Sequence, residues 1–166
     1  MVRKAGPLLQ LWITTDTNPI ALIKDLLSLG EGPYGLLYIL NIPRATNRAG
    51  RYQSPPLDRS RLFQWLDQFT AYLSGDGRHN LWIYDLSASS RHPRLVYNNH
   101  EIIIAYGAIE QIETHLRLRH FSEAEIQIPA PHSHAFNVQF DDDEAAILKS
   151  SNWKHFPLQP ADEVGL

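Results

Sequence analysis

The chain has 166 residues, of which 43% are hydrophobic and 20% are charged, and its formal net charge is −3. This length and composition are typical of one ordinary globular domain and exclude a disordered chain. The acidic balance gives no basic surface to neutralise phosphates, so we expect no nucleic-acid partner. The absence of cysteine excludes disulfides, thiolate nucleophiles and cysteine-based metal sites.

The N-terminal region does not have the pattern of a signal peptide. Its first residues are basic, but the apolar run that follows is short and soon meets Thr14, Thr15 and Asp16. No segment approaches the roughly 20 apolar residues that cross a bilayer. We therefore expect a cytoplasmic protein without a membrane partner.

The first half of the chain predicts strands and amphipathic helices in alternation. Residues 8–14 form a short β-like run, and Asn18 and Pro19 then begin a helix that ends at Gly30. The segment Tyr34–Ile42 is apolar on both faces, which is typical of a central strand. An irregular loop over 43–57 follows, and a loop of that length is often functional.

The clearest helix of the sequence is predicted over 58–73. Asp58 is its N-cap, and its apolar residues recur at a spacing of three and four. Glycines end it, and residues 81–86 read as the next strand.

Shorter elements are predicted in the second half. Residues 94–97 and 100–105 flank Asn98 and Asn99, which favours a hairpin. A helix over 109–120 and a half-exposed strand over 124–128 follow. A short helix over 145–148 comes next, and Asp141 or Asp142 is placed to cap it. The tail from residue 157 has no regular pattern.

These elements predict the α+β class in one domain over residues 1–166. The adjacent hairpin and the short connections argue against an all-parallel sheet. We expect a mostly antiparallel or mixed sheet of five to six strands, packed by about three helices.

Two histidines and a group of acids near the end of the chain are the candidate metal ligands. His132 and His134 lie nine and seven positions before Asp141. A catalytic zinc, iron or manganese needs about three such ligands. The alternative is that the aspartates bind free backbone N–H groups at a helix start and the histidines are ordinary loop residues. The sequence leaves both interpretations open.

Two arginine-containing turns are the candidate anion or ligand site. Arg51 and Tyr52 follow Gly50, and Arg78 and His79 follow Gly77; arginine forks suit carboxylates and phosphates. If the 58–73 helix joins parallel strands, the two arginines start at opposite ends of the sheet, and they converge only if the strands run antiparallel or the long loop folds across. The alternative is that both are solvated turn residues paired with acids such as Asp76.

Large aromatic residues are expected mainly in the core. Trp12, Trp65, Trp82 and Tyr106 fall in predicted elements or at their ends, which favours core packing. Trp153 lies in a less regular segment, where it either packs the tail onto the body or offers an exposed anchor to a partner.

The runs GRYQSP, GDGRHNLW and PHSHAFN together resemble a family of small bacterial proteins to which no activity is assigned, over about Tyr34–Pro157. This resemblance implies no catalytic residue. The overall profile is also similar to that of bacterial toxin-immunity proteins. Each candidate catalytic group has a sufficient structural explanation, so we expect a small soluble bacterial binding protein without catalytic activity or cofactor, with a protein partner or a homodimer. The alternative is a metal-dependent hydrolase or oxygen-using enzyme that holds zinc or iron on the His132/His134 loop.

Overall fold

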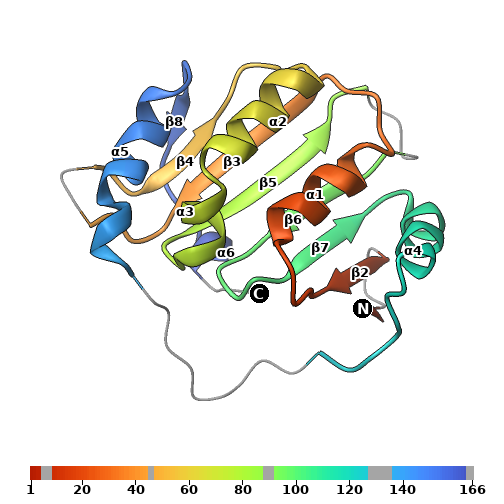
Figure 1. The fold of residues 1–166 in the computed structure, drawn as a ribbon. Coiled ribbons are helices and arrows are strands. Elements are labelled where there is room, and N and C mark those ends of the chain that lie inside the picture. The colour runs from red at the N-terminus through yellow and green to blue at the C-terminus, as the bar shows by residue number, and fades with distance from the viewer. Residues whose placement is uncertain (5–8, 45–46, 88–91, 127–135, 164–166) are drawn as a thin grey trace.

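The computed structural model describes residues 1–4, 9–44, 47–87, 92–126 and 136–163. These residues form one antiparallel sheet with a layer of helices on one face (Figure 1). The strand order is β1 (Val2–Lys4), β2 (Gln10–Ile13), β7 (Ile103–Tyr106), β6 (Arg94–Tyr97), β5 (His79–Asp85), β3 (Tyr34–Leu40), β4 (Gly50–Gln53) and β8 (Lys154–Phe156).

The strand β3 lies inside the sheet, third from the β8 edge, and pairs antiparallel with both β4 and β5. The two flanking strands therefore run parallel to each other, and the α2 and α3 helices connect them. Leu40 of β3 pairs with Gly50 on one side and with His79 on the other. Both flanking strands consequently begin at the same end of the sheet.

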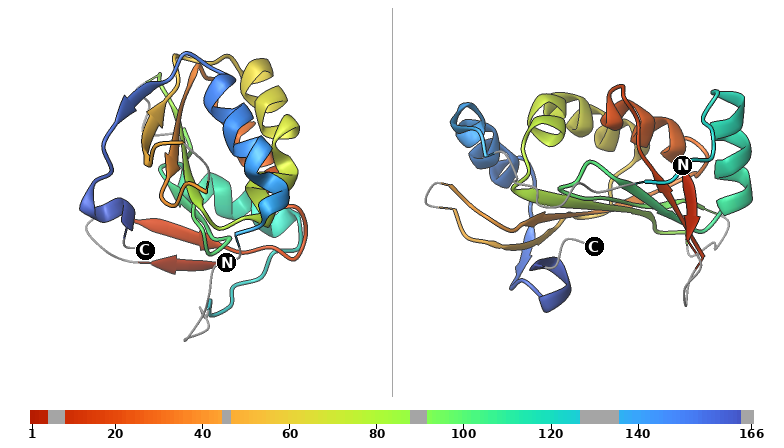
Figure 2. Two further views of the ribbon diagram at one scale, coloured as in Figure 1. Left: turned by 90° about the vertical axis from the view of Figure 1, so that its left-hand side faces the viewer. Right: turned by 90° about the horizontal axis from the view of Figure 1, so that it is seen from below.

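Five helices cover one face of the sheet, and a four-residue helix lies on the other (Figure 2). The covering helices are α1 (Pro19–Leu27), α2 (Arg59–Gln68), α3 (Thr70–Gly75), α4 (Ile109–Leu118) and α5 (Asp141–Lys149), with the 3-10 turn η1 (Val138–Phe140) before α5; the short helix is α6 (Pro160–Glu163). Asn18 and Asp58 cap α1 and α2 as predicted, since each side-chain oxygen accepts a backbone N–H. Among the described residues, no helix has the length and apolar character needed to cross a membrane.

The main core lies between β3 and the helices, because alternate strand residues point to opposite faces. Tyr34, Leu36, Tyr38 and Leu40 all belong to it and are fully buried. A smaller cluster on the opposite face consists of Val96, Ile102 and Ile104. The second face is otherwise less covered, and Trp82 on it is 37% exposed. Trp65 packs in the main core as expected, whereas Trp82 does not.

The predicted class, α+β with a mostly antiparallel sheet, is confirmed, but the predicted number of elements is wrong. The sheet has eight strands where five to six were predicted, and the described residues contain six α-helices where about three were predicted. Strands of three or four residues, such as β1, β4 and β8, are too short for periodicity to reveal. They exist because each pairs with a longer neighbour.

Several predicted boundaries are also corrected. The 43–57 segment is not one irregular loop, since β4 lies within it, and the 58–73 helix divides into α2 and α3 at Phe69. Residues 121–126 run without regular structure, so the described part of the 124–128 strand is not formed. The tail contains α6. The predicted hairpin of β6 and β7 is confirmed, but residues 98–102 connect its strands and β7 begins at Ile103 instead of residue 100. The helix α4 begins at Ile109 as predicted and ends at Leu118.

The less covered face has a close contact that requires a glycine. Gly35 pairs across the strands with Tyr84, and a Cβ placed on Gly35 would lie 2.5 Å from the Tyr84 ring. The ring therefore lies flat on the backbone of β3. No larger residue fits at position 35 while Tyr84 keeps this position.

We expect Gly35→Ala to lower the free energy of unfolding by about 1–3 kcal/mol, because the added methyl overpacks this contact. Urea unfolding measures the loss. In the double variant with Tyr84→Ala the methyl meets no ring, so the combined loss should be smaller than the sum of the two single losses. Additive losses would show that the ring does not clash.

Candidate functional site

The most polar buried cluster of the structure surrounds Arg78, whose side chain is completely buried. The residue lies in the turn between α3 and β5. Asp76 stands two residues before it in the same turn, and Asp141 and Glu144 come from the first turn of α5. We call these four residues the Arg78 cluster.

Every N–H group of the Arg78 guanidinium has an acceptor. Nε and Nη2 bind the two carboxylate oxygens of Asp76 at 2.7 and 2.9 Å. Nη1 donates to Glu144 at 2.7 Å and to Asp141 at 2.9 Å, and Nη2 also donates to the carbonyl of Asn137. Arginine has five donors, so none remains for a ligand. Burial opposes the charge, but the hydrogen bonds to Asp76, Glu144 and Asp141 outweigh burial and raise the pKa of Arg78 above its ordinary value.

A second part of the chain binds the same carboxylates. Arg44 donates from Nε to Asp141 at 2.9 Å, and its backbone N–H reaches Glu144. Asn47 donates to the other oxygen of Glu144 at 2.7 Å. The start of the 43–57 segment is therefore held against α5 by the same acids that bind Arg78.

His79 extends the buried polar region into the core. Its ring stacks on Tyr72 at 4.8 Å and on Tyr38 at 5.6 Å, and the two tyrosine hydroxyls share a hydrogen bond of 2.6 Å. Burial lowers the pKa of His79 to about 4, although the charge of Asp76 acts in the opposite direction. Burial likewise raises the pKa of both tyrosines. All three rings are therefore neutral at pH 7, and they pack as aromatic side chains.

Arg51 and Tyr52 lie apart from the Arg78 cluster. Both arginines are at the same end of the sheet, but Arg78 faces α5 whereas Arg51 faces the opposite side, where its Nε lies 3.4 Å from Asp162 of α6. Tyr52 points to the helix side and packs on His155. The four residues of the predicted anion site therefore do not form one pocket. Arg78 is paired with Asp76, as the alternative interpretation expected, but it is buried instead of solvated.

Of the three predicted metal ligands, Asp141 alone lies among the residues that the structure describes. His132 and His134 lie outside the described residues. Asp141 belongs to the Arg78 cluster, and among the residues that the structure describes no group of three His, Asp or Glu side chains is arranged to hold a metal ion. The predicted helix is confirmed, but neither Asp141 nor Asp142 is its N-cap: both lie in the first turn of α5, and the N-cap is Phe140, which makes no side-chain hydrogen bond. Asp141 binds the two arginines instead.

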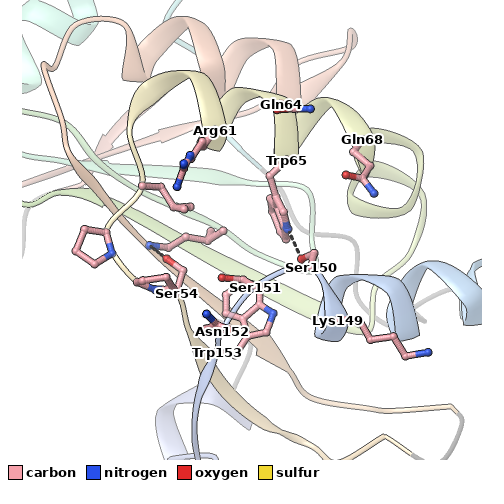
Figure 3. A pocket seen from close by; sticks show the side chains of 14 residues that line it. Ser54, Arg61, Gln64, Trp65, Gln68, Lys149, Ser150, Ser151, Asn152 and Trp153 are labelled. Carbon is pink, nitrogen blue, oxygen red and sulfur yellow. Dashed lines mark hydrogen bonds between the residues drawn. The ribbon is translucent and has the colours of Figure 1, made fainter.

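A groove of about 580 Å³ lies between α2 and the connection from α5 to β8. Trp65 of α2 and Trp153 of the connection lie side by side in its lining (Figure 3). Their ring centroids lie 6.2 Å apart in an edge-to-face arrangement. Pro55, Pro56 and Leu57 contribute further apolar surface. We call this hollow the tryptophan groove.

Both indole N–H groups in the tryptophan groove are hydrogen-bonded to protein. Trp65 donates to the hydroxyl of Ser150 at 2.8 Å, and Trp153 donates to the carbonyl of Ile147 at 2.9 Å. The Ser150 hydroxyl in turn donates to the Ile147 carbonyl at 2.7 Å. The two rings are thus held in place before any ligand arrives.

The rim of the tryptophan groove is polar and basic. Its cations are Arg61 and Lys149, and its amides are Gln64, Gln68 and Asn152, while no carboxylate is among the fourteen lining residues. Arg61 pairs with the exposed Asp58 at 3.5 Å. The sequence predicts core packing for Trp65 and a separate role for Trp153, so this groove was not predicted. The two tryptophans are 88 positions apart, and nothing in the sequence links them.

We expect Arg78→Met to lower the free energy of unfolding by about 3–5 kcal/mol, because Asp76 and Glu144 then stay buried without their counter-charge. Arg44→Met is the matched control. That side chain is partly exposed and shares Asp141 with Arg78, so the expected loss is below about 1 kcal/mol. Guanidinium unfolding compares the two variants. Equal losses would contradict the assignment of Arg78 as the buried centre.

A pH dependence follows from the lowered pKa of His79. The unfolded state binds a proton at a pKa near 6.5 and the folded state only near 4. The contribution of neutral His79 to the free energy of unfolding is therefore fully present above pH 6.5 and is lost as the pH falls towards 4. It amounts to about 3 kcal/mol. His79→Phe, which keeps a stacked ring, should remove this dependence when urea unfolding is measured between pH 7.5 and 4.

The control for this measurement is His120→Asn, which changes an exposed histidine and should leave the slope as in the wild type. Parallel curves for the wild type and His79→Phe would show that His79 is not the titrating group.

Comparisons with known proteins give no further evidence on the site. No protein-family model, no curated protein and no solved structure matches the chain. The resemblance of GRYQSP, GDGRHNLW and PHSHAFN to a bacterial family stays a prediction. The function is therefore inferred from the geometry of the described residues alone.

Proposed function

We propose that this protein is a non-enzymatic binding protein whose tryptophan groove takes an extended acidic segment of a protein partner. The observation that carries the proposal is the groove itself, a pre-formed pair of tryptophans beneath a rim with two cations and no carboxylate. Its volume lies within the range of roughly 300–1,000 Å³ that is usual for ligand sites. The bacterial and cytoplasmic assignments remain part of this proposal and rest on the sequence.

The two tryptophans favour binding because their side-chain positions are already fixed. Ordering side chains during association costs roughly 0.5–1.5 kcal/mol for each flexible side chain. Trp65 and Trp153 are held by hydrogen bonds to Ser150 and to Ile147, so little of that cost remains. Tryptophan is also the residue type most enriched at the energetic centres of protein interfaces.

The charge of the rim favours an acidic ligand. Arg61 and Lys149 lie on opposite sides of the groove, one on α2 and the other at the end of α5. A ligand that carries Asp or Glu would pair with both cations, and at Arg61 it would compete with the exposed Asp58, which lies 3.5 Å from that guanidinium. The chain as a whole is acidic, so this local basic rim would also set the orientation of an approaching partner.

Hydroxyl groups of the tryptophan groove support binding over catalysis. Ser54 accepts the backbone N–H of Leu36, and Ser150 joins Trp65 to Ile147. A serine nucleophile requires an adjacent base. Lys149 is the lining residue that could serve as one, but the Ser150 hydroxyl next to it is bonded to Trp65 and Ile147. These groups therefore shape the groove, and the proposal assigns them no reaction.

An array of eight-residue peptides tests the proposal. Each peptide combines aromatic or proline residues with Asp and Glu, and each has a partner in which Asn and Gln replace the acids. We expect acidic members to bind with a Kd on the order of micromolar, measured by fluorescence anisotropy, and their neutral partners to bind at least about tenfold more weakly. The affinity should fall as NaCl is raised.

Charge reversal identifies the site. Arg61→Glu with Lys149→Glu, both at exposed positions, should abolish binding of the acidic peptides while leaving the circular dichroism spectrum unchanged. Arg94→Glu, at an exposed position of β6 outside the groove, is the matched control and should bind as the wild type does. Unchanged binding in the double variant, or no binding peptide in the array, would overturn the proposal.

A further inference from the structure

A second hollow lies on the opposite face of the sheet, away from the tryptophan groove. Its volume is about 350 Å³, and the segment after β8 forms one wall. The lining residues are Leu37, Arg51, Gln53, Tyr84, Phe156, Pro157 and Gln159. We call it the Arg51 hollow. Figure 2 shows α6 on this side of the sheet, with all other helices on the far side.

The surface of the Arg51 hollow is largely apolar and held in position. Tyr84 lies flat on Gly35, and its hydroxyl accepts a hydrogen bond from Gln53 at 3.4 Å. Leu37 is adjacent on β3, and Phe156 is 45% exposed at the edge strand. These side chains offer two aromatic rings and an aliphatic group to the body of a small ligand.

Among the described residues that line this hollow, Arg51 is the one with a charge, and few of its donors are used. The guanidinium lies 6.0 Å from the centroid of the Trp82 ring. Its Nε is buried without a hydrogen-bond partner, and the contact with Asp162 at 3.4 Å is an ion pair only. No hydrogen bond joins the guanidinium to any residue that the structure describes. Arg78 is the opposite case, because all five of its donors are used.

Asp162 therefore lies where an anion would pair with Arg51, but it lacks the hydrogen-bond geometry of a strong arginine–carboxylate pair. Arginine binds a carboxylate best through two parallel N–H bonds in the plane of the fork. The Asp162 carboxylate makes no such pair, and it also accepts the backbone N–H of Gln159 at 2.8 Å. Its bond to Gln159 holds it within the α6 segment. A ligand that is free to align would bind Arg51 better.

We propose that the Arg51 hollow binds a small monocarboxylate with an apolar body. The carboxylate pairs with Arg51 and takes the place of Asp162, and the apolar part lies against Tyr84, Leu37 and Phe156. A single arginine matches a single negative charge, and the nearby Asp162 would repel a doubly charged phosphate. The hollow is close to the lower size limit of ligand sites, which suits a body of about six carbon atoms.

Benzoate and hexanoate are the probes for this site, with benzamide as the uncharged control. Binding is followed by NMR through the chemical shifts of the Trp82 indole and of nearby amides. We expect saturable binding of both carboxylates and none of benzamide. Asp162→Asn should tighten binding about three- to tenfold, because the competing internal carboxylate is removed. Arg51→Met should weaken it at least about tenfold.

Arg51→Lys is the second variant, because it keeps the charge and loses only the planar fork. We expect it to bind benzoate more weakly than the wild type does. The proposal is overturned if neither the wild type nor Asp162→Asn binds a carboxylate, if Arg51→Met and Arg51→Lys bind like the wild type, or if Asp162→Asn binds more weakly. The double variant Arg61→Glu, Lys149→Glu should bind benzoate normally, so a failure here is distinguishable from a failure of the tryptophan groove.

Discussion

The buried guanidinium of Arg78 is the constraint on which the arrangement of this protein depends. A charge removed from water must have opposite charges and acceptors for all its donors, because an unpaired buried ion costs several kcal/mol. Asp76 alone provides two acceptors. The remaining ones come from Asn137 and from the first turn of α5, 59 to 66 positions along the chain. The C-terminal part of the chain is therefore fixed to the sheet by electrostatics as well as by apolar packing.

The position of α5 in turn determines the tryptophan groove. Ile147 and Ser150, at the end of this helix, are the hydrogen-bond partners of the two indoles. The ring centroid of Trp153 also lies 6.4 Å from that of Tyr38, and the Tyr38 hydroxyl shares a hydrogen bond with Tyr72 in the core. Polar contacts at one end of α5 and aromatic contacts at the other thus connect the Arg78 cluster to the proposed binding surface. The cluster supports the groove without facing it.

Arg51 and Arg78 show how surroundings decide the use of one residue type. Both lie near Leu40 at the same end of the sheet, on opposite faces. Arg78 meets three carboxylates and a carbonyl, so it is committed to the fold. Arg51 meets one carboxylate in a poor orientation and borders a hollow. The number and geometry of the local acceptors, and not the residue, make one arginine structural and leave the other able to bind a ligand.

The sequence predicted the elements whose signals are local. The caps Asn18 and Asp58, the apolar spacing of α1, α2 and α4, and the hairpin of β6 and β7 all depend on residues a few positions apart. The α+β class and the largely antiparallel sheet followed from their order. The short strands β1, β4 and β8 were missed because three or four residues carry almost no periodic signal, and long-range pairing alone defines them.

The candidate sites depended on tertiary structure for the same reason. The turn Gly75-Asp76-Gly77-Arg78 suggested an anion site, but only the fold brought Asn137, Asp141 and Glu144 to Arg78 and used all its donors. Trp65 and Trp153 each have an unremarkable setting in the sequence, and they form a groove only because α5 places them side by side. Sequence determines which groups are available and how local segments fold. Burial and the spatial convergence of distant residues decide which of those groups remain free to bind.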